Sequence, residues 1–278
     1  MPSILGHELW RATLETLAKK NELGHGYIFF GPEGVGKRQV ALSLASYLET
    51  GIFEARGAIL IDASLREPSG GTLGIDEIRD VKAFLGQTPL RSPRRTVIID
   101  NAETLTIQAQ NALLKTAEEP PPHALIILIV RDYELLFPTL VSRLSRLYFA
   151  PLQKEVIHEW CLKGGASAKE AERAAALSRG APGRAWRILR DEKFQALVRL
   201  GDQLLVTPWS ERKALLKEYL ESEEADVLQL IETLIVLTDL QLEKPLPFLK
   251  SALTLKREAA TFNLNPRLQL ENLLSLIP

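Results

Sequence analysis

One stretch near the N-terminus constrains the fold more than any other, because it joins a buried strand to a helix through a glycine-rich loop. Residues 27–30 are four consecutive apolar or aromatic residues, which is typical of a short buried strand. The loop after them, GPEGVGK at residues 31–37, has the G-x4-G-K spacing of a phosphate-binding loop. Residues 38–48 then place apolar side chains at helical spacing. The sequence therefore predicts the strand, loop and helix of a P-loop protein.

The residues of this loop have separate expected roles. Gly31, Gly34 and Gly36 let the backbone curl so that its N–H groups point inward. Lys37 supplies a positive charge for phosphate oxygens. Arg38 stands where the motif requires Ser or Thr, whose hydroxyl binds Mg²⁺. We expect these five positions to bind phosphate without efficient hydrolysis; the alternative is a tight turn that binds no ligand.

The composition is that of an ordinary globular protein and excludes several kinds of site. The 278 residues are 46% hydrophobic and 25% charged and leave room for two or three domains. A formal net charge of −1 provides no overall basic field for nucleic acid. A single cysteine, Cys161, cannot form an intrachain disulfide or a cysteine zinc cluster. Because the start lacks signal-peptide features and the longest apolar run, residues 124–130, cannot span a bilayer, we expect a cytoplasmic protein with no membrane partner.

Strands and helices alternate over the first 150 residues. Apolar runs predict further strands at residues 58–61, 96–100, 125–130 and 146–149. Helical spacing predicts helices at residues 8–20, 75–85 and 107–119, and residues 135–144 look partly helical despite Pro138. Because strands that alternate with helices form parallel sheets covered on both faces, we expect residues 1–150 to form one α/β domain.

Beyond Pro151 the sequence predicts only helices. Three short helices at residues 154–162, 168–177 and 184–189 fit a small domain at 151–192, and Ser167 with Glu170 forms a capping box for the second. Residues 193–278 are expected to form a separate all-helical domain. Its helices are predicted at residues 194–206, 208–221 with Thr207 as N-cap, 223–242, and twice after Pro247, the last from about Pro266.

A carboxylate ends the third predicted strand. In P-loop NTPases an acid at this position reaches the Mg²⁺ shell, and the following residue is often a glutamate that polarises the attacking water. Asp100 fits the first role, although it could serve only to cap the next segment. Asn101 holds the second position, and an amide cannot accept a proton. Together with Arg38, this residue predicts a site that does not turn over nucleotide.

Several motifs together resemble those of the AAA+ clamp-loader family. They are the loop itself and the runs GIDEIR (74–79), VIIDNAETL (97–105), NALLKTAEEPP (111–121) and LFPTLVSR (136–143). They cover most of residues 4–190, while the remainder matches only in being helical. The resemblance implies an AAA+ P-loop parallel sheet domain at 1–150, a helical lid domain at 151–192 and a helical collar at 193–278 that assembles with other subunits.

The resemblance also implies roles for particular arginines. Arg143 stands where the family carries an arginine that crosses a subunit boundary into the neighbour's ATP site and stabilises charge on the transferred phosphoryl group. Without the resemblance, a solvated surface arginine explains it. Arg184 resembles the lid arginine that senses nucleotide in its own subunit, although it could instead pack or pair with an acid. Arg131 replaces the small polar residue that the family often has there, which weakens the site further.

The implied function is that of a non-hydrolysing subunit that completes an AAA+ ring in DNA replication. The implied partners are the ATPase subunits (gamma/tau) and a delta subunit, with the sliding clamp and primer–template DNA reached through the assembly. No cofactor is required, and the site either is empty or holds ATP or ADP without hydrolysis. Many family members carry four zinc-binding cysteines where residues 49–58 have none, so we expect no metal. The alternatives are an active AAA+ ATPase and a stand-alone P-loop regulator.

Overall fold

The computed structural model describes residues 5–54, 59–68, 71–222, 225–241, 246–259 and 266–276. The chain divides into two compact units, Met1–Gly183 and Arg184–Pro278. The division falls inside helix α8 (Pro182–Arg190). The predicted domain boundaries after residues 150 and 192 stay predictions. No helix among the described residues is both long enough and apolar enough to cross a membrane.

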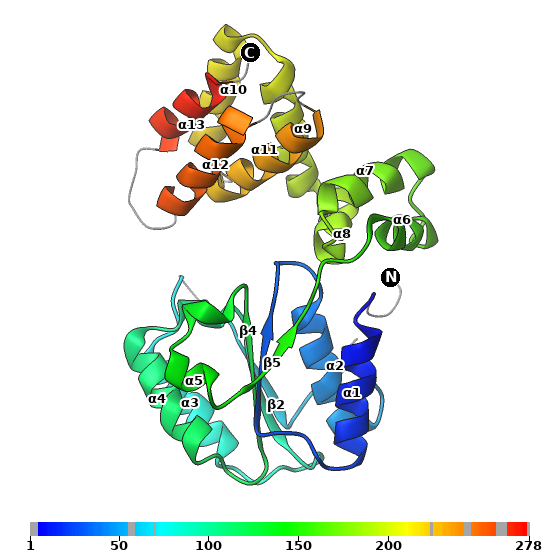
Figure 1. Ribbon diagram of the computed structural model, residues 1–278, viewed down its shortest axis with the longest axis vertical. Coiled ribbons are helices and arrows are strands. Elements are labelled where there is room, and N and C mark those ends of the chain that lie inside the picture. The colour runs from blue at the N-terminus through cyan, green and yellow to red at the C-terminus, as the bar shows by residue number, and fades with distance from the viewer. Residues whose placement is uncertain are drawn as a thin grey trace. The chain divides into compact units, whose positions relative to one another are not determined.

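A five-stranded sheet forms the centre of the first unit (Figure 1). Its strand order is β2-β3-β4-β1-β5, and every neighbouring pair is parallel, as predicted. Strands β3 and β4 are buried along their whole length, which is expected of parallel strands covered on both faces. The strands are β1 (Gly26–Phe30), β2 (Ala63–Arg66), β3 (Arg95–Ile99), β4 (Ala124–Val130) and β5 (Ser145–Tyr148).

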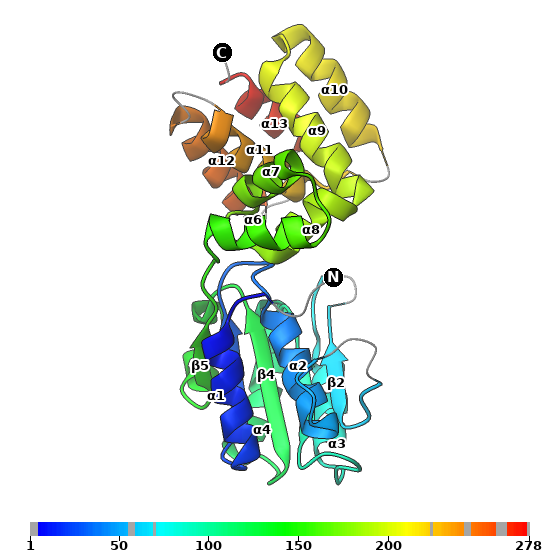
Figure 2. The ribbon, with the colours of Figure 1, turned by 90° about the vertical axis from the view of Figure 1, so that its right-hand side faces the viewer.

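Helices cover both faces of this sheet. Helices α1 and α2 lie side by side over one face (Figure 2), where Phe29 and Leu44 are buried. Helices α3, α4 and α5 cover the other face, where Ile28 and Leu113 are buried. Because successive strand residues point to opposite faces, Ile28 and Phe29 enter different cores. The bounds are α1 (Glu8–Lys19), α2 (Lys37–Thr50), α3 (Ile75–Leu85), α4 (Ile107–Glu118) and α5 (Pro138–Val141), with short 3-10 turns η1 (Ala102–Thr104) and η2 (Tyr133–Leu135).

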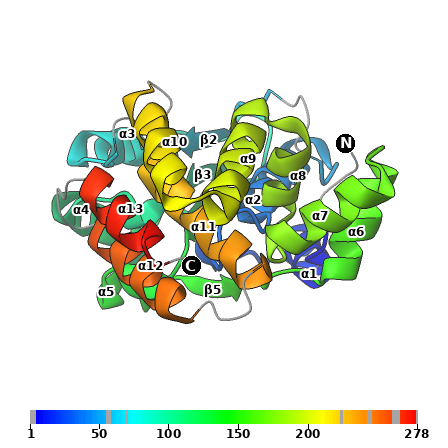
Figure 3. The same cartoon turned by 90° about the horizontal axis from the view of Figure 1, so that it is seen from above.

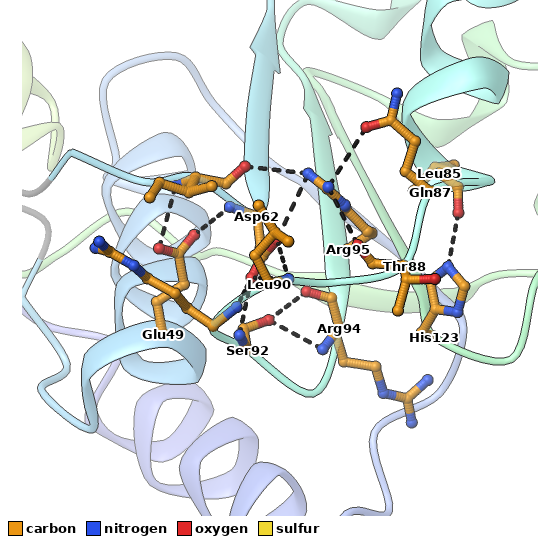
Figure 4. A network of polar contacts seen from close by, with 12 residues as sticks. Glu49, Asp62, Leu85, Gln87, Thr88, Leu90, Ser92, Arg94, Arg95 and His123 are labelled. Atoms are coloured by element: carbon orange, nitrogen blue, oxygen red, sulfur yellow. Dashed lines mark hydrogen bonds and ion pairs between the residues drawn. The ribbon is translucent and has the colours of Figure 1, made fainter.

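The second strand is formed by residues later than the sequence predicts. It was expected at residues 58–61, of which residue 58 lies outside the described part of the chain, and pairing with β3 begins only at Ala63. The N–H groups of Ile61 and Asp62 donate instead to the Glu49 carboxylate, at 3.1 and 2.7 Å (Figure 4). The apolar run misled the prediction because β2 is a half-buried edge strand and need not be apolar.

A buried carboxylate anchors the chain just before β2. Asp62 is 1% exposed and accepts hydrogen bonds from the backbone N–H groups of residues 90–92, at 2.6–3.0 Å (Figure 4). Arg95 Nη1 lies 3.5 Å from Asp62 Oδ1, and its guanidinium stacks on the Phe84 ring. Burial alone would raise the pKa of Asp62, but the backbone donors and Arg95 outweigh it and hold that pKa below its usual range.

Two helices complete the first unit before α8. They are α6 (Lys154–Lys163) and α7 (Ala168–Ser178), which pack against each other. The predicted capping box opens α7, because Ser167 Oγ accepts the Glu170 N–H at 3.3 Å and the Glu170 carboxylate accepts the Ser167 N–H at 2.9 Å. Local polar chemistry therefore fixes the start of this helix.

Helices are the only regular secondary structure among the described residues of the second unit. Helix α11 packs against α9 and α12, which lie beside it in Figure 3, and Leu230, Ile231 and Leu234 of its predicted apolar stripe are buried. The predicted start of α11, at residues 223 and 224, lies outside the described residues. The helices are α9 (Glu192–Val206), α10 (Trp209–Glu221), α11 (Val227–Gln241), α12 (Leu246–Ala259) and α13 (Pro266–Leu274).

One predicted helix cap in this unit is wrong. Thr207 was expected to cap the start of α10 but is the C-cap of α9, and its N–H donates to the Gln203 carbonyl at 3.0 Å. Pro208 precedes the first residue of α10, Trp209. Only two residues connect α9 to α10. Thr207 can therefore cap the end of one helix or the start of the other, and the sequence does not distinguish these two roles.

Candidate functional site

The glycine-rich loop joins β1 to α2 as predicted. Gly31, Gly34 and Gly36 have φ values of 138, 75 and 113°, a region that residues with a side chain rarely adopt. Gly31 has a second constraint, because a Cβ there would lie 2.3 Å from the carbonyl oxygen of Phe149. The glycines therefore fix the path of the loop independently of any ligand.

Lys37, the first residue of α2, is turned onto its own loop. Its side chain is buried, and Nζ donates to the carbonyls of Gly31 and, at 2.7 Å, Pro32. Burial lowers the pKa of Lys37 to about 8, while the nearby carboxylates of Glu103 and Asp100 act in the opposite direction. At neutral pH the amine is therefore still mainly protonated and can face an anion.

Arg38 lies at the expected metal position and is paired with acids. Its Nη1 contacts the Glu67 carboxylate and lies 3.6 Å from Asp100 Oδ2. Burial raises the pKa of Asp100, which follows β3. A guanidinium has only N–H donors and cannot bind a cation, and the predicted metal carboxylate faces that guanidinium. This donor set does not fit Mg²⁺.

Asn101 adopts a left-handed backbone conformation, with φ 49° and ψ 47°. Asparagine tolerates this conformation better than glutamate does, so Asn101 suits the turn into η1 as well as lacking a proton-accepting carboxylate. Its N–H donates to Asp100 Oδ1 at 3.0 Å. Asp100 is not the cap of η1, whose N-cap is Asn101 without a side-chain capping bond, so its alternative role as a cap is wrong.

Arg131, which follows β4, lies between two further acids, Glu33 in the loop and Glu103 after β3. Its Nη2 lies 2.8 Å from Glu33 Oε2, within the loop, and its Nε lies 3.8 Å from Glu103 Oε1. Glu103 Oε2 is buried and has no hydrogen-bond partner among the described residues. The loop cluster thus places Lys37, Arg38 and Arg131 among Glu33, Glu67, Asp100 and Glu103. Its carboxylates offset its cations, which disfavours a highly charged phosphate ligand.

Three acids of the loop cluster, Glu33, Glu67 and Glu103, were not predicted as site residues. Glu33 and Glu103 lie inside the motifs, but nothing in their spacing indicates that both meet Arg131. Glu67 follows the strand whose position was mispredicted, so its approach to Arg38 could not be inferred. The motifs themselves contain Glu33 and Glu103, whereas no motif points to Glu67.

Arg143 is separate from the loop cluster and lies just after α5. Its side chain is 34% exposed, and Nη2 lies 2.6 Å from Glu118 Oε1 at the end of α4. Its Nη1 donates to the Thr139 carbonyl at 2.6 Å and to Ser142 Oγ at 3.4 Å. The guanidinium is therefore at the surface of the first unit, where a neighbouring molecule can reach it.

A cavity of about 490 Å³ lies beside this segment. Arg146, on its rim, stacks on Tyr133 with its guanidinium carbon 4.8 Å from the ring centroid. The lining residues are Tyr133, Glu134, Leu136, Pro138, Val141, Ser142, Leu144 and Arg146. The cavity thus adjoins the residues on either side of Arg143 in the sequence.

Arg184 is the first residue of the second unit. Its guanidinium carbon lies 5.8 Å from the centroid of the Phe194 ring, which Arg187 also contacts at 4.3 Å. This stacking matches the alternative that Arg184 packs against its surroundings. Its role in sensing nucleotide stays a prediction.

The structure offers no ready metal site in the part of the chain that it describes. There, no group of three or more histidine, cysteine, aspartate or glutamate side chains is placed to hold a metal ion. Cys161 is buried, and burial raises the pKa of its thiol, which disfavours the thiolate that metals bind. That the protein works without zinc stays a prediction.

The amino-acid sequence from residue 6 to residue 153 matches the family model described as DNA polymerase III, delta subunit, which is more than half of the chain. The chain belongs to this family. Together with curated relatives named DNA polymerase III subunit delta', this match confirms the predicted resemblance to the AAA+ clamp-loader family.

Curated relatives match the chain over parts of their length. The DNA polymerase III subunit delta' of Bacillus subtilis is 33% identical over 51% of this chain and 46% of its own length. Subunit delta' of Escherichia coli is 29% identical over 67% of this chain and 61% of its own length. Subunit tau of B. subtilis is 29% identical over 55% of this chain and 30% of its own length. The chain covers less than two thirds of each of these relatives.

Two solved structures share the fold of this chain. A DNA polymerase III gamma subunit-related protein from Thermotoga maritima is 27% identical, with a TM-score of 0.63 over 95% of this chain and 97% of that one. A mutant of RuvB from the same organism has a TM-score of 0.53 at 18% identity, over 96% and 85%. The second likeness concerns the fold alone, and both agree with an AAA+ architecture.

Proposed function

We propose that this clamp-loader family member is a non-hydrolysing delta-prime subunit of a DNA polymerase III clamp loader, acting in DNA replication. It completes the AAA+ ring through its helical collar and places Arg143 in the ATP site of the adjacent ATPase subunit. The observation that carries the proposal is the approach of Arg38 to Asp100 at 3.6 Å. This contact supports the proposal because the carboxylate expected to serve a metal ion faces a guanidinium instead, whereas Arg143 lies outside the loop cluster.

The contribution of Arg143 is electrostatic. Hydrolysis at the neighbour's site forms a bond between a water oxygen and the γ-phosphorus, breaks the bond to the bridging oxygen, and yields ADP, phosphate and a proton. Negative charge on the phosphoryl and bridging oxygens is stabilised by N–H donors of the guanidinium, which stays protonated throughout. An arginine placed this way leaves binding of ATP largely unchanged and accelerates the chemical step.

The proposed partners follow from the same role. They are the gamma/tau ATPase subunits and the delta subunit, with the sliding clamp and primer–template DNA engaged through the whole assembly. Relatives named delta', tau and gamma/tau support partners within the polymerase III complex. The subunit needs no cofactor of its own, and its loop either is empty or holds ATP or ADP without hydrolysis.

The decisive experiment changes Arg143 to alanine in a reconstituted assembly in which only the ATPase site facing this subunit is competent. Arg143→Ala should lower single-turnover ATP hydrolysis at that site by more than about tenfold, because transition-state charge loses its partner. Arg79→Ala is the matched control, since Arg79 is also a surface arginine paired with an acid, Asp76, at 2.6 Å. Assembly should be unchanged in both variants, and normal hydrolysis with Arg143→Ala would refute the proposal.

A second candidate function is an active clamp-loader ATPase. It is favoured by the relatives named tau and gamma/tau, which are about as similar to this chain as those named delta'. It requires steady ATP turnover by the isolated chain that depends on Mg²⁺ and is lost in Lys37→Ala. We expect no such turnover, because Arg38 lacks a metal-binding oxygen.

A further inference from the structure

Arg143 is held from two sides by contacts that the proposed function does not use. Its Nη2 lies 2.6 Å from Glu118 Oε1, and its Nη1 donates to the Thr139 carbonyl at 2.6 Å. Glu118 is the last residue of α4, whereas Thr139 belongs to α5, and these two helices pack against each other. The guanidinium is thus fixed between two elements that are distant in the sequence.

The Glu118 contact contributes little to stability. Its two side chains are 34% and 46% exposed, and ion pairs in such positions are weakened by solvent and by the cost of ordering two long side chains. What the contact does restrict is the orientation of a flexible arginine. Orientation matters for a residue that must meet a phosphoryl group across a subunit boundary, because small displacements of a catalytic group lower rates strongly.

The carboxylate comes from a rigid support. Helix α4 is anchored in the core by Leu113 and Ala117, which are buried five residues and one residue before Glu118. Helix α5, by contrast, spans only Pro138–Val141 and offers Arg143 the Thr139 carbonyl, with the hydroxyl of its C-cap Ser142 beside it. A site held by a long packed helix is positioned more accurately than one held by a short turn.

The contacts leave the arginine able to act. A guanidinium carries five N–H donors. Among the described residues, Nη1 donates to Thr139 and Ser142, and Nη2 forms an ion pair with Glu118. N–H groups on Nε and Nη2 therefore remain for oxygens of a phosphoryl group. Glu118 can hold Arg143 without having to release it first.

We propose that Glu118 is a positioning residue for Arg143, fixing the guanidinium in the orientation in which it enters the neighbouring ATP site. This inference rests on the proposed function. It adds that the catalytic strength of the arginine depends on a carboxylate in α4 of the same subunit. Glu118 itself touches neither nucleotide nor water in this role.

The test uses the same reconstituted assembly with one competent site. Glu118→Ala should lower kcat at that site by about tenfold and leave KM for ATP unchanged, because loss of orientation affects the transition state more than substrate binding. Glu118→Gln keeps an oxygen acceptor for Nη2 and should recover part of the rate. The matched control is Glu15→Ala, which removes another half-exposed acid, paired with Lys19 at 2.7 Å.

A double variant separates positioning from other effects. If Glu118 acts through Arg143, Glu118→Ala combined with Arg143→Ala should be no slower than Arg143→Ala alone. In the isolated chain, ¹⁵N relaxation of the Arg143 Nε–H should show greater mobility in Glu118→Ala and no change in Glu15→Ala. The second measurement needs no partner and checks the structural half of the inference.

The possible outcomes separate the positioning role of Glu118 from the proposed function of Arg143. A normal rate with Arg143→Ala overturns both. A reduced rate with Arg143→Ala but a normal or faster rate with Glu118→Ala overturns the positioning role alone. Additive losses in the double variant also overturn it, since Glu118 would then act by another route.

Discussion

Arg38 brings a guanidinium to within 3.6 Å of Asp100 Oδ2, in the place where active P-loop proteins have a hydroxyl and Mg²⁺. The change is one residue, but its consequence depends on the acids around it. Glu67 and Asp100 both contact Arg38, so its guanidinium is held by two carboxylates. At the residue scale we therefore expect the loop to keep its shape without binding Mg²⁺.

The ionisation of Lys37 provides a first test of this arrangement. Its pKa is lowered by burial to about 8, and Glu103 is the acid that opposes this shift most. We expect the ¹³C shift of Lys37 Cε to titrate with a midpoint near pH 8. Glu103→Gln should lower the midpoint further, because a carboxylate that favours the protonated amine is removed. A distant change, Glu15→Gln, should leave the midpoint alone, and a midpoint near pH 10.4 in the unaltered protein would contradict the burial of the amine.

Asp62 gives a second residue-scale prediction, concerning stability and pH. Asp62→Asn should lower the free energy of unfolding at pH 7 by about 3 kcal/mol, because buried backbone donors and Arg95 lose a charged acceptor. The folded-state pKa of Asp62 lies below its unfolded value, so its stabilisation is complete above about pH 4 and is lost as the pH falls through the folded pKa. Urea unfolding at pH 7 and pH 3 should show the gap between the two proteins narrowing at low pH; a constant gap would contradict it.

At the scale of elements, local signals placed most helices and strands within two residues. The capping box of α7 and the apolar spacing of α3 are short-range patterns that act within one element. Strand β2 was misplaced because its position depends on Glu49, which binds the preceding backbone from another element. The glycine-rich loop lies between these cases, because Gly31 is required both by its backbone conformation and by the close approach of Phe149, the residue after β5.

Gly31 and Gly51 allow the two requirements on glycine to be separated. Both have positive φ, of 138 and 76°, but a Cβ on Gly31 would lie 2.3 Å from the Phe149 carbonyl oxygen, whereas nothing lies within 4 Å of one on Gly51. Gly51→Ala should therefore cost about 1–2 kcal/mol from backbone strain alone. Gly31→Ala should cost at least about 3 kcal/mol, because backbone must also move. Urea unfolding of both variants measures the difference. Equal losses of unfolding free energy would mean that the close approach of Phe149 to Gly31 is unimportant.

At the scale of the whole molecule, the chain consists of two compact units with separate buried cores. The first unit holds the loop cluster and Arg143, and the second is helical in its described residues. A chain built this way need not unfold in one step, because each core can be lost separately. The proposed division of labour between a catalytic surface and an assembling collar also requires two such units.

Calorimetry can test this independence. Ile127 and Leu234 are each fully buried, one in β4 and the other in α11. Replacing either with alanine should destabilise its own unit by about 2–5 kcal/mol. We expect two thermal transitions in the unaltered chain, with each variant lowering only one of them. A single transition lowered equally by both variants would show that the chain unfolds as one cooperative body.

The sequence by itself determined the order of strands and helices, the glycine-rich loop between β1 and α2, and the chemical character of its substitutions. These conclusions depend on periodicity, glycine spacing and side-chain chemistry, which are properties of neighbouring residues. That Arg38 has no metal-binding oxygen and Asn101 no carboxylate required no structure at all.

Only the tertiary structure decided which acids meet which arginines. Glu67 reaches Arg38, Glu33 reaches Arg131 and Glu118 reaches Arg143, each across elements that the chain brings together by packing. The partner of an exposed or half-buried charge leaves no periodic trace in the sequence, because it is chosen by the arrangement of whole helices and strands. The ion pair between Glu33 and Arg131 and the ion pair between Glu118 and Arg143 were therefore visible only in the folded protein.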